Sequence, residues 1–288
     1  MKIYQNEDLK GYIDAATKPE WKERDFVNYA REYMNKSNLK VLAIGGLMGT
    51  GKTTGLLQAI KEFDACYIVA EKEEPETSEE YIEFLKNTEK KYIVIDEYGW
   101  IKERSLLDKY LFTAIQNGKR IAITGKDNIT LEYLNYGDLM HRVDMVHCTF
   151  VSYGEYCRIN DLTVCKKTRE EYLNYGGICS EWTVTDFDVL KNYIKVAIID
   201  NMVVYTQIPV KKVTAIVYSI LNSMVSTKHI SDTDFFSESG DDIDITFTIN
   251  QYKRVKDILE EVGVIVTVPD CGRNIFLPYK NIVNTRKV

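Results

Sequence analysis

A lysine and a threonine stand at the end of a glycine-rich segment, where they are placed to hold phosphate groups. Counted from Gly46, the segment reads G-x-x-x-x-G-K-[ST], with Gly51, Lys52 and Thr53 at its end, and the apolar run VLAI lies shortly before it. Glycines permit backbone angles that turn consecutive N–H groups around an anion, and a helix that follows adds the partial positive charge of its N-terminus. The spacing is that of a phosphate-binding loop between a strand and a helix. We expect nucleotide phosphates to be bound by Gly46, Leu47, Met48, Gly49, Thr50, Gly51, Lys52, Thr53 and Thr54.

An acidic pair at the end of a later apolar segment supplies the other half of the expected chemistry. Asp96 and Glu97 follow the run YIVI, and one more short strand is expected between the loop and this run. The carboxyl ends of parallel strands form the rim of a ligand site, so the pair should face the loop. We expect ATP and Mg²⁺ there, with Lys52 on the β- and γ-phosphates and with Thr53 and Asp96 holding the metal. Glu97 would orient and deprotonate the water that attacks the γ-phosphate.

Two further polar residues are candidates for the reaction. Thr124 ends the predicted strand 120–124 and would hydrogen-bond the attacking water or the γ-phosphate, with Asn128 as second choice. A Thr–Gly pair at a strand end is also ordinary turn chemistry. Arg142 precedes a strand predicted at residues 144–150, and we expect it on the same rim, as a finger that stabilises transition-state charge in a neighbouring subunit. A surface arginine or an ion pair within the chain is the alternative.

The composition is that of a globular protein with free thiols. The chain has 288 residues, 45% of them hydrophobic and 28% charged, and a formal net charge of -6. This charge argues against a basic nucleic-acid coat but leaves room for a local basic face. The six cysteines contain no CxxC pair, and with three histidines they form no recognisable zinc pattern. The N-terminal segment lacks the apolar core of a signal peptide and no apolar run is long enough to span a bilayer, so we expect a cytoplasmic protein without membrane contact.

Five segments together resemble a known class of proteins. They are GLMGTGKT, IVIDE, RIAITGKDN, LMHRV and TFVSYGEYCRI, and with them residues 39–159 look like the AAA+ class of P-loop ATPases. Within that class the chain resembles the prokaryotic family often described as archaeal-type ATPases or ATP-binding proteins, in which a winged helix follows the AAA+ module. The resemblance implies Walker A and Walker B roles for the loop and the acidic pair, a sensor role for Thr124 and an arginine position for Arg142. Lys126 departs from the family, whose members carry small hydroxyl residues after the sensor glycine.

The C-terminal half is predicted to be mainly helical, with a hairpin near its end. Residues 154–206 resemble the helical lid of AAA+ proteins. Its basic residues, for which phosphate contact and plain solvation are the two interpretations, are Lys166, Lys167 and Arg169. An amphipathic helix after Pro209, a second at residues 250–262 and two short strands joined by PDCGRN give the outline of a winged helix. Basic residues available to DNA phosphates are Lys253, Arg254, Lys256 and Arg273. Nearby acidic residues dilute this charge, and protein contacts are the alternative use.

The expected fold is α/β, with a P-loop AAA+ core on a five-stranded parallel sheet flanked by helices, a helical lid and a C-terminal winged helix. The predicted boundaries are a helical lead-in at 1–38, the core at 39–153, the lid at 154–206 and the winged helix at 207–288. The expected function is Mg²⁺-dependent ATP hydrolysis coupled to DNA or a protein partner, with a homo-oligomer as a further expectation. A slow or non-hydrolysing nucleotide switch that acts by protein contacts is the alternative. A small-molecule P-loop kinase is disfavoured because no basic lid with an acceptor site is recognisable.

Overall fold

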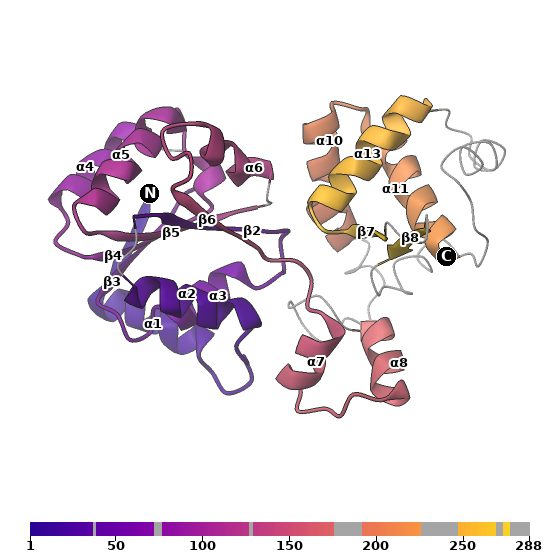
Figure 1. Ribbon diagram of the computed structural model, residues 1–288, viewed down its shortest axis with the longest axis horizontal. Helices are drawn as coiled ribbons and strands as arrows, with labels where there is room; N and C mark the ends of the chain where they lie inside the picture. Colours follow the sequence, from indigo (N-terminus) through magenta and orange to yellow (C-terminus); the bar gives the residue numbers. More distant parts are fainter. Residues whose placement is uncertain are drawn as a thin grey trace. The chain divides into compact units, whose positions relative to one another are not determined.

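The computed structural model describes residues 1–36, 39–71, 77–126, 129–175, 192–225, 247–268 and 273–276. The chain divides into two compact units, Met1–Cys148 and Thr149–Val288, called unit 1 and unit 2 (Figure 1).

Unit 1 is built on a six-stranded sheet in which five strands run parallel. In space the strands follow the order β1-β3-β4-β5-β2-β6. Strand β5 therefore lies between β2, which leads into the glycine-rich loop, and β4, which ends in the acidic pair, and it pairs in parallel with both. The predicted five-stranded parallel sheet is confirmed. The strands are β1 (Lys2–Gln5), β2 (Val41–Gly45), β3 (Ala65–Val69), β4 (Tyr92–Asp96), β5 (Arg120–Gly125) and β6 (Val143–His147).

The sixth strand, β1, is the one the sequence did not predict. The lead-in was expected to be helical from its start, but β1 pairs antiparallel with β3, from Lys2↔Val69 to Gln5↔Cys66. A run of four half-polar residues is too short for its periodicity to separate strand from helix. The strand forms because β3 would otherwise leave an open sheet edge, which is a property of the folded sheet rather than of the segment itself.

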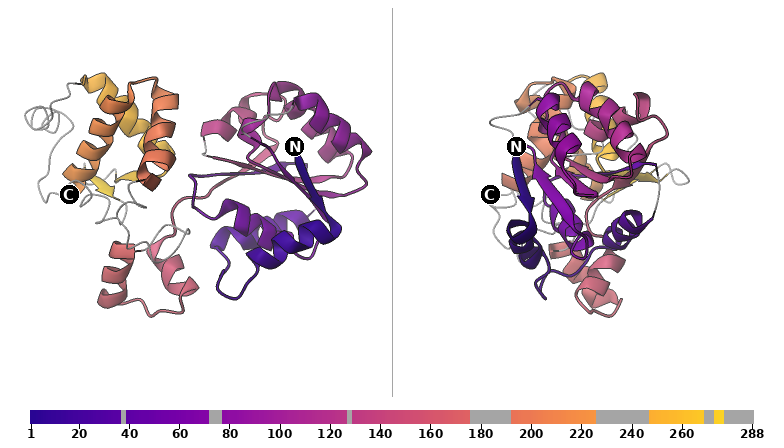
Figure 2. Two further views of the ribbon diagram at one scale, coloured as in Figure 1. Left: turned by 180° about the vertical axis from the view of Figure 1, so that it is seen from behind. Right: turned by 90° about the vertical axis from the view of Figure 1, so that its left-hand side faces the viewer.

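Helices cover both faces of this sheet, α1 to α3 on one and α4 to α6 on the other (Figures 1 and 2). Alternate residues of β2 enter the two layers: Val41 and Ala43 pack with α4 and α5, whereas Leu42 and Ile44 pack with α1, α2 and α3. Burial on both faces explains why the inner strands β2 to β5 are mainly apolar, whereas the edge strand β6 is half-buried and carries Asp144. The helices are α1 (Asn6–Ala16), α2 (Asp25–Asn35), α3 (Lys52–Ala59), α4 (Ser78–Asn87), α5 (Arg104–Gln116) and α6 (Ile129–Glu132), with short 3₁₀ turns η1 (Tyr98–Trp100) and η2 (Tyr133–Tyr136).

The described residues of unit 2 form helices followed by two antiparallel strands, which pair from Ile265↔Phe276 to Val268↔Arg273. Its longest helices agree in outline with the predicted winged helix, which stays a prediction, as do the four domain boundaries. Parts of the predicted lid (176–191) and of the hairpin turn (269–272) lie outside the described residues. The elements are α7 (Tyr153–Ile159), α8 (Lys166–Tyr175), the π-helix η3 (Ile194–Ile199), α10 (Asp200–Thr206), α11 (Val210–Val225), α13 (Ile249–Glu261), β7 (Ile265–Val268) and β8 (Arg273–Phe276).

Candidate functional site

The glycine-rich loop joins β2 to α3 at the carboxyl edge of the sheet. Gly49 and Gly51 have φ values of 78° and 83°, a region that favours glycine. Gly46 is required for a different reason, because a Cβ built there would lie 2.1 Å from the carbonyl oxygen of Cys148. Helix α3 begins at Lys52, directly behind the loop, so its N-terminus faces the loop's concave side. The local structure is thus that of an anion-binding loop.

Lys52 lies within the loop and is only 5% exposed. Its Nζ donates hydrogen bonds to the carbonyl oxygens of Gly46 and Leu47, at 2.6 and 2.9 Å. The hydroxyl of Thr50 donates to the same Leu47 oxygen at 2.8 Å. An ammonium group has three N–H donors, so these two contacts hold the side chain at the loop while leaving one donor for a phosphate oxygen.

A hydrogen bond links the residues after the loop to the acidic pair. The hydroxyl of Thr53 donates to Oδ2 of Asp96 at 2.8 Å, across a separation of 43 residues. Asp96 ends β4 and is 4% exposed. A hydroxyl oxygen beside a carboxylate is a donor set that suits Mg²⁺, which takes oxygen ligands and keeps several waters and phosphate oxygens. Within the described ranges no group of three or more His, Cys, Asp or Glu side chains is arranged to hold a metal, and Mg²⁺ bound to a nucleotide does not need one.

Thr124 connects the two acidic residues. Its hydroxyl donates to Oδ1 of Asp96 and accepts the backbone N–H of Glu97 at 2.9 Å. The side chain is fully buried at the end of β5. Glu97 itself has φ 58° and ψ 42°, a left-handed conformation that costs a residue with a side chain about 1–3 kcal/mol and is typical of functional sites. The geometry makes Thr124 a brace of the acidic pair, and its expected contact with water or phosphate stays a prediction.

Tyr67, on the neighbouring strand β3, was missed by the sequence analysis. Its hydroxyl donates to Oδ2 of Asp96 at 2.6 Å. Burial raises the pKa of this phenol, and the nearby negative charge of Asp96 raises it further. The register pairs Tyr67 with Val94, which lies on the same face of β4 as Asp96 because residues two apart in a strand share a face. Knowledge that β3 and β4 are neighbours would have been needed to find this contact.

Arg24, in the lead-in segment between α1 and α2, contacts the loop directly. Its Nη1 donates to the carbonyl oxygen of Thr50 at 2.6 Å and to Sγ of Cys148 at 3.5 Å. The next aromatic residue, Phe26, lies against Gly55 of α3, where a Cβ would come within 2.3 Å of the ring. The segment was expected only to be a helical lead-in, and the structure adds that one buried guanidinium holds the loop's backbone.

The placement of Arg142 on the same rim is wrong. Arg142 precedes β6, and its carbonyl oxygen accepts the N–H of Val41, the first residue of β2. In a parallel sheet all strands begin at the edge opposite the loop, and the five residues of β2 span roughly 13 Å at the usual rise. The guanidinium lies over the ring of Phe112, 5.5 Å from its centre. A role for Arg142 at the site of a neighbouring subunit stays a prediction.

The other candidate residues have different contacts, each within its own unit. Lys126 is placed over the ring of Trp100, 5.2 Å from its centre, and Asn128 is outside the described residues. Lys167 forms an exposed pair with Glu171 at 3.9 Å within α8. In unit 2, Nη2 of Arg254 donates to the carbonyl oxygen of Tyr205 at 3.2 Å. The other predicted lid and DNA-contact residues that the structure places on these elements are Lys166 and Arg169 on α8, Lys253 and Lys256 on α13, and Arg273 on β8.

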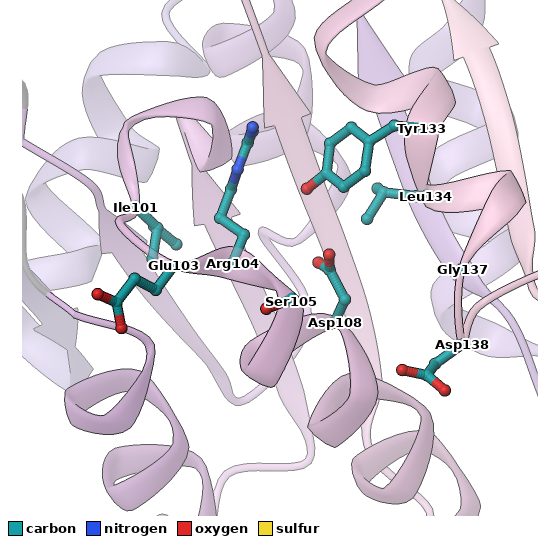
Figure 3. Close-up of a pocket in the computed structure, with 9 residues that line it drawn as sticks. All are labelled: Ile101, Glu103, Arg104, Ser105, Asp108, Tyr133, Leu134, Gly137 and Asp138. Atoms are coloured by element: carbon teal, nitrogen blue, oxygen red, sulfur yellow. The ribbon is translucent and has the colours of Figure 1, made fainter.

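A hollow in unit 1, lined by none of the loop residues, lies between the first turns of α5 and η2. Its volume is about 540 Å³, and none of its lining residues belongs to the predicted nucleotide site. Figure 3 shows the carboxylate of Asp108 pointing toward the phenol of Tyr133, with Arg104 alongside. Asp108 accepts a hydrogen bond from the hydroxyl of Tyr98 at 2.5 Å, and burial raises the pKa of its carboxyl group. The contribution of Asp108 to the stability of unit 1 therefore depends on pH.

Comparison with known proteins places the loop and the acidic pair in one family. Residues 38–157 match the family described as AAA domain. This segment is an AAA domain. The order of its parallel strands, the loop on β2 and the acidic pair on β4 are together the fold of an AAA+ P-loop ATPase, as the sequence predicted. No curated protein matches the chain.

Solved structures share the fold at low sequence identity. A Walker-type ATPase of Pyrococcus abyssi is 14% identical, with a TM-score of 0.54 over 94% of this chain and 98% of that chain. The ORC1 protein of Aeropyrum pernix, solved in complex with DNA, is 11% identical with a TM-score of 0.40 over 91% of each chain. At 14% identity the likeness to the Walker-type ATPase concerns the fold alone. No helix in the described part of the chain is long and apolar enough to cross a membrane.

Proposed function

We propose that the chain is a Mg²⁺-dependent ATPase in which ATP binding and hydrolysis are coupled, through the C-terminal unit, to binding of DNA or of a protein partner. The phosphates bind the loop from Gly46 to Thr54, Lys52 contacts the β- and γ-phosphates, and Thr53 and Asp96 hold the metal. Glu97 is the general base. The AAA domain supports nucleotide binding, and the acidic pair Asp96–Glu97 supports hydrolysis.

The observation that carries the proposal is the hydrogen-bonded group around Asp96. The Thr53 hydroxyl from the loop and the Thr124 hydroxyl from β5 both donate to its carboxylate, and Thr124 also accepts the Glu97 N–H. Three elements that are far apart in the sequence thus bring the Thr53 hydroxyl to the Asp96 carboxylate, and Glu97 follows Asp96 directly, which supports the proposed metal and base roles. A site that only binds nucleotide has no need of that second acid.

Each of these site residues has a definite role in the proposed reaction. Bound Mg²⁺ supplies charge neutralisation on the β- and γ-phosphate oxygens. Lys52 keeps its position through the Gly46 and Leu47 carbonyls and offers a donor to the same oxygens. Thr124 holds Asp96 and the Glu97 backbone in fixed relation, so that the Glu97 carboxylate accepts a proton from the attacking water.

The test is the steady-state rate of ATP hydrolysis in Glu97→Gln, with Glu62→Gln as the matched control. Glu62 is exposed on the turn after α3, so its loss should leave the rate unchanged. Removal of a general base lowers a rate by about a hundredfold or more, while nucleotide binding persists. A negligible rate in the wild type would favour the non-hydrolysing switch. ADP release driven by an added metabolite would favour the kinase.

The proposed coupling to DNA can be tested directly by measuring binding to duplex DNA. Lys253, Arg254, Lys256 and Arg273 are the proposed phosphate contacts. Binding to duplex DNA should occur at low salt and weaken steeply as salt rises, because counterions are released from the DNA. Lys253→Glu combined with Arg254→Glu should weaken binding, and an unchanged affinity would leave a protein partner as the remaining class. Size measurement with and without ATP tests the proposed homo-oligomer.

A further inference from the structure

Asp96 accepts hydrogen bonds from three hydroxyl groups, and only two of these belong to residues that the sequence predicted for the site. Oδ2 takes the hydroxyls of Thr53 at 2.8 Å and Tyr67 at 2.6 Å, and Oδ1 takes that of Thr124. A carboxylate has about four acceptor positions, two on each oxygen. Oδ2 is therefore saturated, and a single acceptor position remains, on Oδ1.

We infer that Tyr67 is a positioning residue for this site. Its hydroxyl fixes the plane of the Asp96 carboxylate and leaves that carboxylate one acceptor position, on Oδ1, for a bound divalent cation. This inference rests on the proposed function. The terminal torsion of an aspartate is broad and needs outside constraint. Donors on both oxygens, from β3, β5 and the loop, remove that freedom before the metal arrives.

The phenol is itself held in place from the N-terminal side. Tyr67 is 3% exposed, and its ring centre lies 6.0 Å from that of Tyr4 and 6.1 Å from that of Tyr12. The Tyr4 and Tyr12 rings are 4.3 Å apart. Tyr4 pairs with Tyr67 in the register of β1 and β3. The unpredicted edge strand β1 thus supports the ring whose hydroxyl contacts Asp96.

The change Tyr67→Phe isolates the hydroxyl, because the ring and its packing against Tyr4 and Tyr12 are kept. The matched control is Tyr81→Phe. Tyr81 is fully buried in the same unit, and within the described residues its hydroxyl has no hydrogen-bond partner. Both changes remove one buried phenol oxygen, but only the first removes a donor to Asp96.

The experiment measures the affinity of Mn²⁺ for the protein–ADP complex by electron paramagnetic resonance. Loss of an outer-shell partner of a metal ligand weakens metal binding by about tenfold or more. We expect about a tenfold loss in Tyr67→Phe, a change under twofold in Tyr81→Phe, and in both an ADP affinity in EDTA equal to that of the wild type. Equal Mn²⁺ affinities of Tyr67→Phe and the wild type would overturn the inference.

A second variant shows whether the effect passes through Asp96. In an Asp96→Asn background, the further change Tyr67→Phe should alter Mn²⁺ affinity less than twofold, because the two residues act as one unit. A full tenfold effect in that background would also overturn the inference. Neither measurement needs turnover, so a wild type that binds Mn²⁺ and ADP without hydrolysing ATP would refute the proposed activity and leave Tyr67 under test. A wild type that does not bind Mn²⁺ with ADP would refute both.

Discussion

The substitution Gly46→Ala tests how closely the loop is built against the end of β6. A Cβ at this position would lie 2.1 Å from the Cys148 carbonyl oxygen and 2.9 Å from its carbon, and real Cβ atoms essentially never come within 3.0 Å of another atom. The obstacle is backbone, which is held by the hydrogen bond from Cys148 N to the Gly45 oxygen at 2.7 Å. The loop or the strand end must therefore shift by about 1 Å.

The size of the effect follows from that shift. Overpacking a well-packed site costs about 1–3 kcal/mol, and a rigid obstacle favours the upper end. For a unit of this size 1 kcal/mol corresponds to about 2–4 °C, so the melting temperature should fall by roughly 5–10 °C. A displacement of about 1 Å in a positioning loop can cost about a hundredfold in rate, so ATP hydrolysis should fall by that order.

The assay is thermal unfolding followed by circular dichroism, together with the hydrolysis rate. The matched control is Gly11→Ala, at an exposed position inside α1 where an added Cβ meets nothing within 4 Å. Because alanine favours helix over glycine by up to about 1 kcal/mol, this control should be slightly more stable than the wild type. A Gly46→Ala protein with wild-type melting temperature and rate would refute the close approach.

Three further predictions concern other residues of unit 1. Arg24→Met removes a charged hydrogen-bond donor from the Thr50 carbonyl, a contact worth about 1.5–3 kcal/mol, so the affinity for ADP in a titration should fall about tenfold or more. The control Arg31→Met should change the affinity for ADP little, because the partners of Arg31 are Asn28, Glu23 and Gln58. Burial raises the pKa of Asp108, so the stability that its carboxyl group contributes is present below the unfolded pKa and is lost as pH rises through the folded pKa. The free energy of unfolding of Asp108→Asn relative to the wild type, measured in urea, should therefore increase from pH 4 to pH 7. A difference that stays constant with pH would contradict this. Mixing Arg142→Ala with Lys52→Ala chains should partly restore ATP hydrolysis if Arg142 serves a neighbouring subunit, and no recovery counts against the finger.

The parts of the site that are contiguous in sequence could be predicted. The glycine spacing before Lys52 and Thr53 forces a loop whatever surrounds it, and a β-strand that ends in Asp96 brings the acid to the same edge. Both inferences need only the direction of the strands. The N-terminus of α3 at Lys52 follows from the same spacing.

Contacts that depend on which strands are neighbours could not be predicted. Tyr67 reaches Asp96 because β3 pairs with β4 in one particular register, and Arg24 reaches Thr50 because the lead-in segment docks under the loop. Neither residue stands in a recognisable pattern. The error on Arg142 has a different cause: the sequence placed it before a strand, and the beginning of a parallel strand was not distinguished from its end.

The position of β5 in the sheet has a consequence for how the chain folds. Strands β1, β3 and β4 pair with one another, while β2 pairs only with β5 and β6, and β5 alone joins the two groups. Until residue 120 and those after it have been synthesised, the apolar strand β2 therefore has both edges unpaired. Such non-local pairing slows folding and leaves an edge open to aggregation. Strand β5 joins the two groups of strands, and the other edge of β2, which leads into the glycine-rich loop, is paired only when β6 follows.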